Sequence, residues 1–198
     1  LKKILARLLD PDEFLSPHGF RALSAYHRDH PYELDVEGIR ASIDYEPAES
    51  TTSMFGGNSN WRGPIWMPLN YLLIGAIERY ATFFGDELTV EYPTGSGEHL
   101  NLVEIAADLR GRLIGLFTID AHGRRPCFGD VDRFQNDPRW FGDIAFNEYF
   151  HGDNGAGLGA THQTGWTGLV ADLIRGRPGN GVYAATDIGR VLGDRMVT

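Results

Sequence analysis

The longest helical pattern in the chain lies at residues 64–85, which read PIWMPLNYLLIGAIERYATFFG. Pro64 suits a first helical turn, and Gly85 is a usual helix stop. Apolar residues recur between them at helical spacing: Ile65, Trp66, Leu69, Leu72, Leu73, Ala76, Ile77 and Tyr80. The stretch therefore predicts an amphipathic helix that ends near Phe84.

Further helices are expected on either side of this one. Residues 1–9 carry a short apolar face, and Asn101 can cap a helix over residues 102–117 whose apolar face is Leu102, Ile105, Ala106, Leu109, Leu113 and Leu116. A last helix is predicted at residues 164–174. Helices separated by long Gly-rich and aromatic loops fit an all-α fold, a partial toroid in which loops at one end build the site.

The long connections are predicted at residues 14–60 and 118–142. The first has extended pieces near residues 34–36 and 41–45, and residues 144–150 could form a short strand. Long ordered loops in compact domains are usually functional. We therefore look for the functional residues in and beside these loops.

The composition excludes several classes of protein. A net charge of -9 without a basic stripe argues against a nucleic-acid partner. No apolar run is long enough to span a bilayer, no Cys/His cluster has zinc spacing, and no phosphate loop is present, so we expect no membrane partner, no metal and no cofactor. A single cysteine, Cys127, weakly favours a reduced, cytoplasmic setting.

Two dense blocks carry the functional signal. Residues 55–66 read FGGNSNWRGPIW, and residues 147–166 read NEYFHGDNGAGLGATHQTGW. Both blocks mix aromatic rings, hydrogen-bonding side chains and glycines, and the second adds the carboxylate of Glu148. Pyranose rings present apolar faces that stack on aromatic side chains and hydroxyl groups that need donors and acceptors. The two blocks therefore predict a sugar pocket and a carbohydrate substrate.

These blocks, together with residues 14–24 (FLSPHGFRALS) and 44–50 (DYEPAES), resemble the C-terminal part of glycoside hydrolase family 63. The resemblance covers nearly all of residues 14–175. It implies an (α/α)6-barrel catalytic domain that hydrolyses α-glucosidic bonds with inversion. Processing α-glucosidase I, bacterial glucosidases and mannosylglycerate hydrolases are among the members of that family.

The resemblance also implies roles for particular residues. Glu148 corresponds to the general base, and residues 61–66 correspond to a segment that lines the sugar subsite. The family's general acid is an Asp upstream of the part represented here. The substrate-binding residues that we expect are Phe55, Trp61, Arg62, Gly63, Trp66, Asn70, Gln163 and Trp166.

Each role has a structural alternative. Glu148 could be a surface carboxylate, and Arg62 could pair with Asp44, Glu46 or Glu49 instead of a sugar. Trp66, on the predicted helix, fits the core better than Trp61 does. A further set of residues suits local structure: Thr164 as a helix cap and Asp153 as a turn former rather than a second acid.

We therefore expect residues 1–178 to be the C-terminal portion of an (α/α)6 glycosidase domain, followed by a loosely specified tail at 179–198. The chain begins at Leu1 without an initiator Met, which fits a truncated start. An inverting hydrolase needs two carboxyl groups, so this segment alone should be nearly inert and should need the N-terminal remainder of its own chain. The alternatives are a trehalase-like enzyme of the same fold and a carbohydrate-binding or scaffold piece without turnover.

Overall fold

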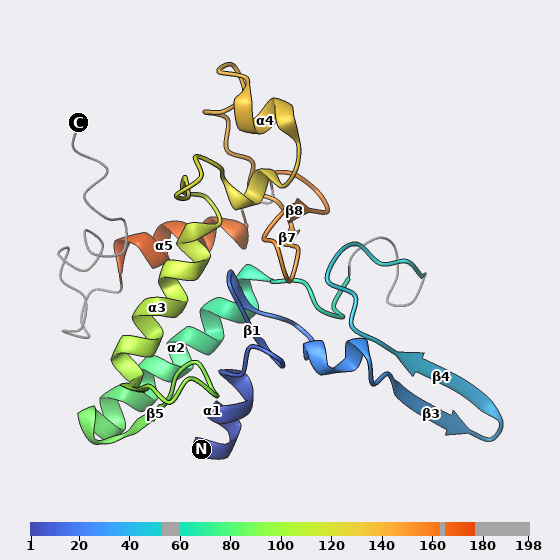
Figure 1. Cartoon of the computed structure of the whole chain (residues 1–198), viewed down its shortest axis with the longest axis vertical. Helices are drawn as coiled ribbons and strands as arrows, with labels where there is room; N and C mark the ends of the chain where they lie inside the picture. The colour runs from blue at the N-terminus through green and yellow to red at the C-terminus, as the bar shows by residue number, and fades with distance from the viewer. Residues whose placement is uncertain (53–59, 163–164, 177–198) are drawn as a thin grey trace.

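The computed structural model describes residues 1–52, 60–162 and 165–176 (Figure 1). The described helices are α1 (Lys2–Leu8), α2 (Met67–Phe84), α3 (Leu102–Gly115), α4 (Asp132–Asn136) and α5 (Val170–Arg175). Short 3-10 helices lie at η1 (Ala25–Arg28), η2 (Gly85–Glu87), η3 (Pro126–Phe128) and η4 (Thr167–Leu169). The predicted tail at 179–198, Thr164 and the site residues Phe55 and Gln163 lie outside the described residues.

The described strands form antiparallel two-stranded sheets. The pairs are β1 (Leu15–Ser16) with β2 (Gly19–Phe20), β3 (Tyr32–Val36) with β4 (Ile39–Ile43), β5 (Thr89–Glu91) with β6 (His99–Asn101), and β7 (Tyr149–Phe150) with β8 (Gly157–Leu158). The prediction of an all-α fold was therefore too narrow. The fold is mostly helical with loops, and the small sheets form where the chain doubles back within the loops. The toroid stays a prediction.

The longest hairpin shows why the loops contain strands. Extended pieces were predicted near residues 34–36 and 41–45, and β3 and β4 pair in register from Tyr32 with Ile43 to Val36 with Ile39. The two residues between them, Glu37 and Gly38, have φ angles of 52° and 81°. Positive φ at both central positions is the requirement of a type I′ hairpin turn, so the local sequence specifies the hairpin. It projects away from the helices in Figure 1.

Helix α2 buries a different face from the predicted one. Its buried residues are Met67, Asn70, Ile74, Gly75, Ile77, Glu78 and Ala81. Leu72 and Tyr80 of the predicted stripe are 68% and 45% exposed. Apolar residues surround this helix on most sides, so their spacing indicates a helix without selecting the face that packs. Gly85 ends the helix with a φ of 62°, as predicted.

Helix α3 follows the prediction closely. Asn101 caps it through Oδ1, which accepts from the Glu104 backbone N–H at 2.9 Å, while the Glu104 carboxylate accepts from the Asn101 N–H at 3.0 Å. This reciprocal pair is a capping box. All residues of the predicted apolar face are buried: Leu102, Ile105, Ala106, Leu109, Leu113 and Leu116. Helix α3 therefore forms the centre of the hydrophobic core.

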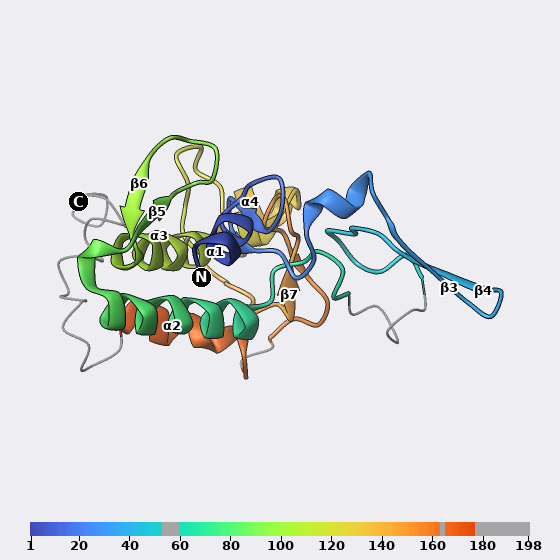
Figure 2. The ribbon, with the colours of Figure 1, turned by 90° about the horizontal axis from the view of Figure 1, so that it is seen from below.

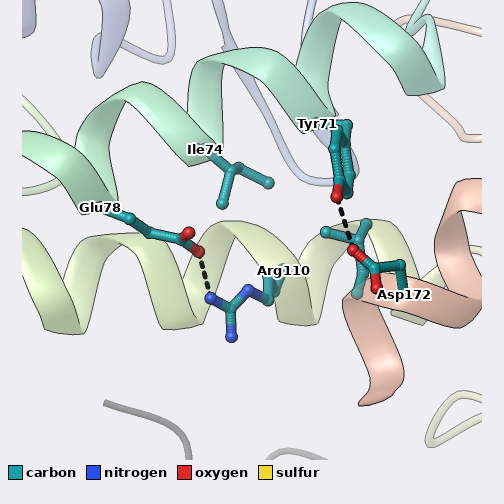
Figure 3. A pocket seen from close by; sticks show the side chains of 7 residues that line it. Tyr71, Ile74, Glu78, Arg110 and Asp172 are labelled. Carbon is teal, nitrogen blue, oxygen red and sulfur yellow. Dashed lines mark hydrogen bonds and ion pairs between the residues drawn. The ribbon is translucent and has the colours of Figure 1, made fainter. Parts of the chain in front are cut away.

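Helices α2, α3 and α5 pack together, and two polar pairs cross between them. Figure 2 shows α2 and α3 as neighbouring layers with α5 beside them. Figure 3 shows Glu78 of α2 paired with Arg110 of α3, and Tyr71 of α2 donating to Asp172 of α5 at 2.5 Å. Both Glu78 and Arg110 are buried. A buried ion pair fixes the relative position of its two elements because a mismatched arrangement would bury an uncompensated charge.

The predicted loop at residues 118–142 has local structure of its own. It contains η3 and α4, which the buried side chain of Gln135 ties together. Gln135 accepts from the Arg125 backbone N–H at 3.0 Å and donates to the carbonyls of Arg125 and Gly129 at 2.9 and 2.8 Å. These hydrogen bonds hold the segment in a defined shape. No helix in the described part of the chain is long and apolar enough to cross a membrane.

Candidate functional site

The two sequence blocks meet through the backbone. Ile65 donates to the Phe150 carbonyl at 2.8 Å and accepts from the Phe150 N–H at 3.0 Å. Ile65 also bridges to Arg21 on its other side, so three segments far apart in the sequence run side by side. Because Ile65 and Phe150 are both fully buried, this ladder is shielded from water. It fixes residues 61–66 against the segment that carries Glu148.

An aromatic cluster forms where the blocks meet. The Trp66 ring stacks on Trp61 at 3.9 Å between centroids and on Tyr149 at 4.7 Å, and it meets Trp166 edge-on at 5.7 Å. Trp66 is only 1% exposed, whereas Trp61 is 46% exposed. Trp66 was expected among the substrate-binding residues, but its ring is enclosed by other aromatic rings. It therefore supports Trp61, which has accessible surface.

Glu148 lies at one side of this cluster, half-buried. Its backbone N–H donates to the Ala160 carbonyl at 2.8 Å, and the Ala160 N–H donates to its Oε2 at 3.2 Å. The Trp166 indole donates to the Glu148 carbonyl at 3.0 Å. A Cβ on Gly159 would lie 2.7 Å from Glu148 Oε2, so glycine at 159 gives the carboxylate its space. The backbone of Glu148 is thus held beside Trp166, and its carboxylate lies beside Gly159 and the Ala160 N–H.

Tyr149, which the sequence analysis did not select, belongs to the same aromatic cluster. Its ring is fully buried. Burial, and then the negative charges of Glu49 and Glu148, raise the pKa of Tyr149 to about 12. A phenol of ordinary pKa is already protonated at neutral pH, so the shift keeps Tyr149 uncharged to a still higher pH. The sequence shows that Tyr149 directly follows Glu148. It does not show that Glu49 lies close enough to act on the Tyr149 phenol.

Arg62 occupies the structural alternative. Its guanidinium is 3% exposed and pairs with the carboxylates of Asp44, at 3.3 Å, and Glu46. It also donates to the hydroxyl oxygens of Ser50 at 3.0 Å and Thr52 at 3.3 Å. These bonds connect the segment at 44–52 to residues 61–66. The ion-pair network is the structural alternative considered for Arg62, and its sugar contact stays a prediction.

Asn70 also serves the fold. It is 1% exposed, its Oδ1 accepts from the Phe20 N–H at 2.6 Å, and its Nδ2 donates to the carbonyls of Phe20 and Trp66 at 3.0 Å each. Both amide hydrogens are used in these bonds. These bonds hold β2 against α2, and the sugar contact of Asn70 stays a prediction.

Gly63 and Gly152 allow a close approach of three segments. A Cβ on Gly63, whose φ is 149°, would lie 2.6 Å from the Tyr45 ring and 2.8 Å from the Glu46 carbonyl. A Cβ on Gly152 would lie 2.5 Å from the Gly63 carbonyl oxygen and 2.6 Å from the Tyr45 hydroxyl. A side chain at either position would push the segments apart. The close packing of these segments therefore requires glycine at position 63.

Asp153 is held by basic side chains. Its carboxylate pairs with Arg21 at 3.2 Å and Arg28 at 2.9 Å, and accepts from the Tyr45 hydroxyl at 2.8 Å. Arg21 is itself buried and also donates to the Leu15 carbonyl at 2.7 Å. Asp153 therefore anchors the segment after β7 to the N-terminal loops.

His151 is a further titratable side chain of the second block. Its Nδ1 accepts from the Asp153 N–H at 3.1 Å. Burial and the nearby charge of Arg28 lower the pKa of His151, against an opposing effect of Asp153. A ring whose Nδ1 accepts a backbone hydrogen bond carries its proton on Nε2 in the neutral form. No group of three His, Cys, Asp or Glu side chains that could hold a metal ion occurs among the described residues.

Comparisons with known proteins relate the chain to a glycosidase at a distance. No protein-family model matches the chain. It is 26% identical over 175 residues to the mannosyl-oligosaccharide glucosidase of Saccharomyces cerevisiae, which covers 88% of this chain and 15% of that protein. It is 51% identical over 176 residues to the uncharacterized protein YMR196W of the same yeast, over 88% of this chain and 16% of that protein. The chain therefore spans about a sixth of the length of these relatives.

Proposed function

We propose that this chain supplies the general base and part of the sugar pocket of a glycosidase that hydrolyses α-glucosidic bonds with inversion. The observation that carries the proposal is the position of Glu148, whose backbone is bonded to Trp166 and whose carboxylate accepts from the Ala160 N–H, beside the aromatic cluster of Trp61, Trp66, Tyr149 and Trp166. The distant likeness to a glucosidase, which extends over 88% of the chain, supports the same reaction.

In this reaction Glu148 takes a proton from a water molecule as that water attacks the anomeric carbon. The attack comes from the face opposite the leaving group, so a second carboxyl group must donate a proton to the departing oxygen. In inverting enzymes the two carboxyl groups stand about 6.5–9.5 Å apart, which leaves room for the water. The proposal assigns the proton donor to a part of the enzyme beyond these 198 residues.

The sugar ring itself is assigned to the surface around Trp61. One face of this indole rests on Trp66, which prevents it from turning, while nearly half of its surface is accessible. An indole held in this way offers an apolar platform for the C–H face of a pyranose. The contacts to the sugar hydroxyls come from polar groups in the same region.

The stereochemistry of the first product tests this proposal. We expect the full-length protein to release β-glucose first from an α-linked glucosyl oligosaccharide, as recorded by 1H NMR within the first minutes of the reaction, before mutarotation. Release of α-glucose first would contradict inversion. Hydrolysis of trehalose alone would indicate the trehalase-like alternative, and sugar binding without any product would indicate a binding module.

A further inference from the structure

The peptide group that enters Glu148 is bonded at both of its ends. Its carbonyl, which belongs to Asn147, accepts from the Thr167 hydroxyl at 2.6 Å. Its N–H, which belongs to Glu148, donates to the Ala160 carbonyl at 2.8 Å. Because a peptide group is planar, bonds at its two ends together fix the orientation of its plane. Thr167 and Ala160 therefore set the backbone that leads into Glu148.

The peptide group that follows Glu148 is held as well. Its carbonyl, which belongs to Glu148, accepts from the Trp166 indole at 3.0 Å. At its other end, Tyr149 pairs with Leu158 in the β7–β8 hairpin. The two peptide planes that flank a residue determine its φ and ψ angles, and so the direction in which its Cα–Cβ bond points. These contacts consequently set the direction in which the Glu148 side chain leaves the backbone.

The side chain of Thr167 offers no surface to a ligand. Its exposed fraction is 0%, so a sugar on the accessible face of Trp61 cannot touch it. Trp166 differs, because it is half-buried and is itself expected to bind substrate. Any effect of Thr167 on turnover must instead pass through the groups that it contacts, first of all the Asn147 carbonyl.

Thr167 stands on an element that the hydrophobic core holds in place. It is the first residue of η4, which continues directly into α5. Val170 and Leu173 of α5 belong to the core, and η4 packs against α2 while α5 packs against α3. Tyr71 of α2 also donates to Asp172 of α5 at 2.5 Å. The hydroxyl is therefore carried by the helical layer, and a rigid support of this kind positions a functional group precisely.

Loss of this hydroxyl would remove the donor that now bonds the Asn147 carbonyl in a buried place. A buried carbonyl that lacks a partner is costly, so the peptide group is expected to tilt toward another donor. The Glu148 carboxylate lies several bonds further along, and a small tilt of the peptide displaces it by more. A misplacement of about 1 Å can lower the rate of a reaction about 100-fold.

From this geometry we propose that Thr167 is a positioning residue for Glu148. Its hydroxyl holds the peptide group in front of the base and thereby keeps the carboxylate within hydrogen-bond reach of the attacking water, which proton transfer requires. The inference rests on the proposed function, because it concerns the base of that reaction. Thr167 itself contacts neither the sugar nor the reacting atoms.

Substitutions that keep or remove the hydroxyl test this role in the full-length protein. The substrate is α-glucosyl fluoride, whose leaving group needs no proton, so its hydrolysis depends on the base. Thr167→Val has nearly the same shape without the hydroxyl, and it should lower kcat about 10–100-fold while KM changes by less than about threefold. Thr167→Ser keeps the hydroxyl and should keep kcat within about threefold of the unmodified value. Unchanged kcat in Thr167→Val would overturn the inference.

Thr167→Ala gives the same comparison without the extra methyl group of valine. It differs from Thr167→Ser only by the hydroxyl, so its kcat should be about 10–100-fold lower than that of Thr167→Ser. The matched control is Thr94→Val, which removes a threonine hydroxyl that donates to the Ala6 carbonyl at 2.7 Å, where α1 meets the loop between β5 and β6. It should leave kcat and KM unchanged. Equal kcat in Thr167→Ser and Thr167→Ala would contradict the positioning role.

A double-mutant cycle separates positioning from damage to the whole site. In Glu148→Ala, azide supplies the nucleophile that attacks α-glucosyl fluoride, and no carboxylate remains to be positioned. Adding Thr167→Val should therefore change the azide-dependent rate by less than about twofold, whereas independent effects would multiply. An equal loss in both backgrounds would mean that Thr167 supports the fold alone, and the inference would fail.

The outcomes also separate this inference from the proposed function. If Glu148→Gln keeps full turnover, or if azide gives no product with Glu148→Ala, the proposed function fails and the inference fails with it. If Glu148→Gln loses turnover while Thr167→Val and Thr167→Ala keep it, only the positioning role of Thr167 is wrong.

Discussion

Replacing Glu148 by Gln is expected to lower kcat of the full-length protein by about 10²–10⁴-fold, the usual contribution of a general base. Glutamine has nearly the same shape, and its amide oxygen can still accept from the Ala160 N–H that now bonds Oε2 at 3.2 Å. It cannot accept a proton from water. Substrate binding should therefore persist while turnover is lost, and steady-state kinetics together with isothermal titration calorimetry on the variant measure the two separately.

Glu49→Gln is the matched control for this variant. Glu49 is an exposed carboxylate whose charge, like that of Glu148, acts on the Tyr149 phenol. It takes no proton in the proposed mechanism, so its replacement should change kcat by less than about tenfold. If Glu49→Gln were as inactive as Glu148→Gln, turnover would depend on the negative charge near Tyr149. The assignment of Glu148 as the specific base would then be contradicted.

Gly152→Ala is expected to loosen the connection between the two sequence blocks. Its Cβ would lie 2.5 Å from the backbone oxygen of Gly63, which cannot move without moving residues 61–66. Overpacking of this kind typically costs about 1–3 kcal/mol, and a clash with backbone belongs at the upper end. Amide hydrogen exchange at Ile65 and Phe150, which bond each other at 2.8 and 3.0 Å, should become about 100-fold faster.

The control for this prediction is Gly115→Ala, at the end of α3. A Cβ at Gly115 meets no atom within 4 Å, so alanine fits there without strain. It should leave exchange at Ile65 and Phe150 unchanged and can stabilise α3 slightly. Unchanged exchange in Gly152→Ala as well would mean that residues 61–66 and 149–152 are not held by the close packing described above.

The sequence predicted helices better than it predicted what they pack against. The apolar residues of α3 alternate with polar ones at helical spacing, so its existence, its cap and its buried face all follow from the pattern. Helix α2 is apolar nearly all round, and only tertiary contacts decide that Met67 and Ile74 face the core while Leu72 does not. The short sheets depend on pairing between loop residues, which periodicity over a few residues cannot specify.

The same distinction holds for the candidate site. The sequence indicated two blocks of aromatic and polar residues, and the structure brings them together through Ile65 and Phe150. The sequence could not show which residues of the blocks are accessible to a ligand and which are buried against the rest of the protein. Trp66, Arg62 and Asn70 have side chains suited to sugars, yet each is nearly fully buried with protein partners. Burial depends on the whole fold, so residue type alone does not reveal it.

The central claim is that Glu148 activates the water that attacks the anomeric carbon, and chemical rescue tests it most directly. The Glu148→Ala variant of the full-length protein is incubated with α-glucosyl fluoride, whose leaving group needs no proton, and with azide as a small nucleophile. We expect azide to restore turnover and to give β-glucosyl azide, because it attacks from the side that the lost carboxylate served. An absence of rescue, or formation of α-glucosyl azide, would contradict the assignment of Glu148 as the base.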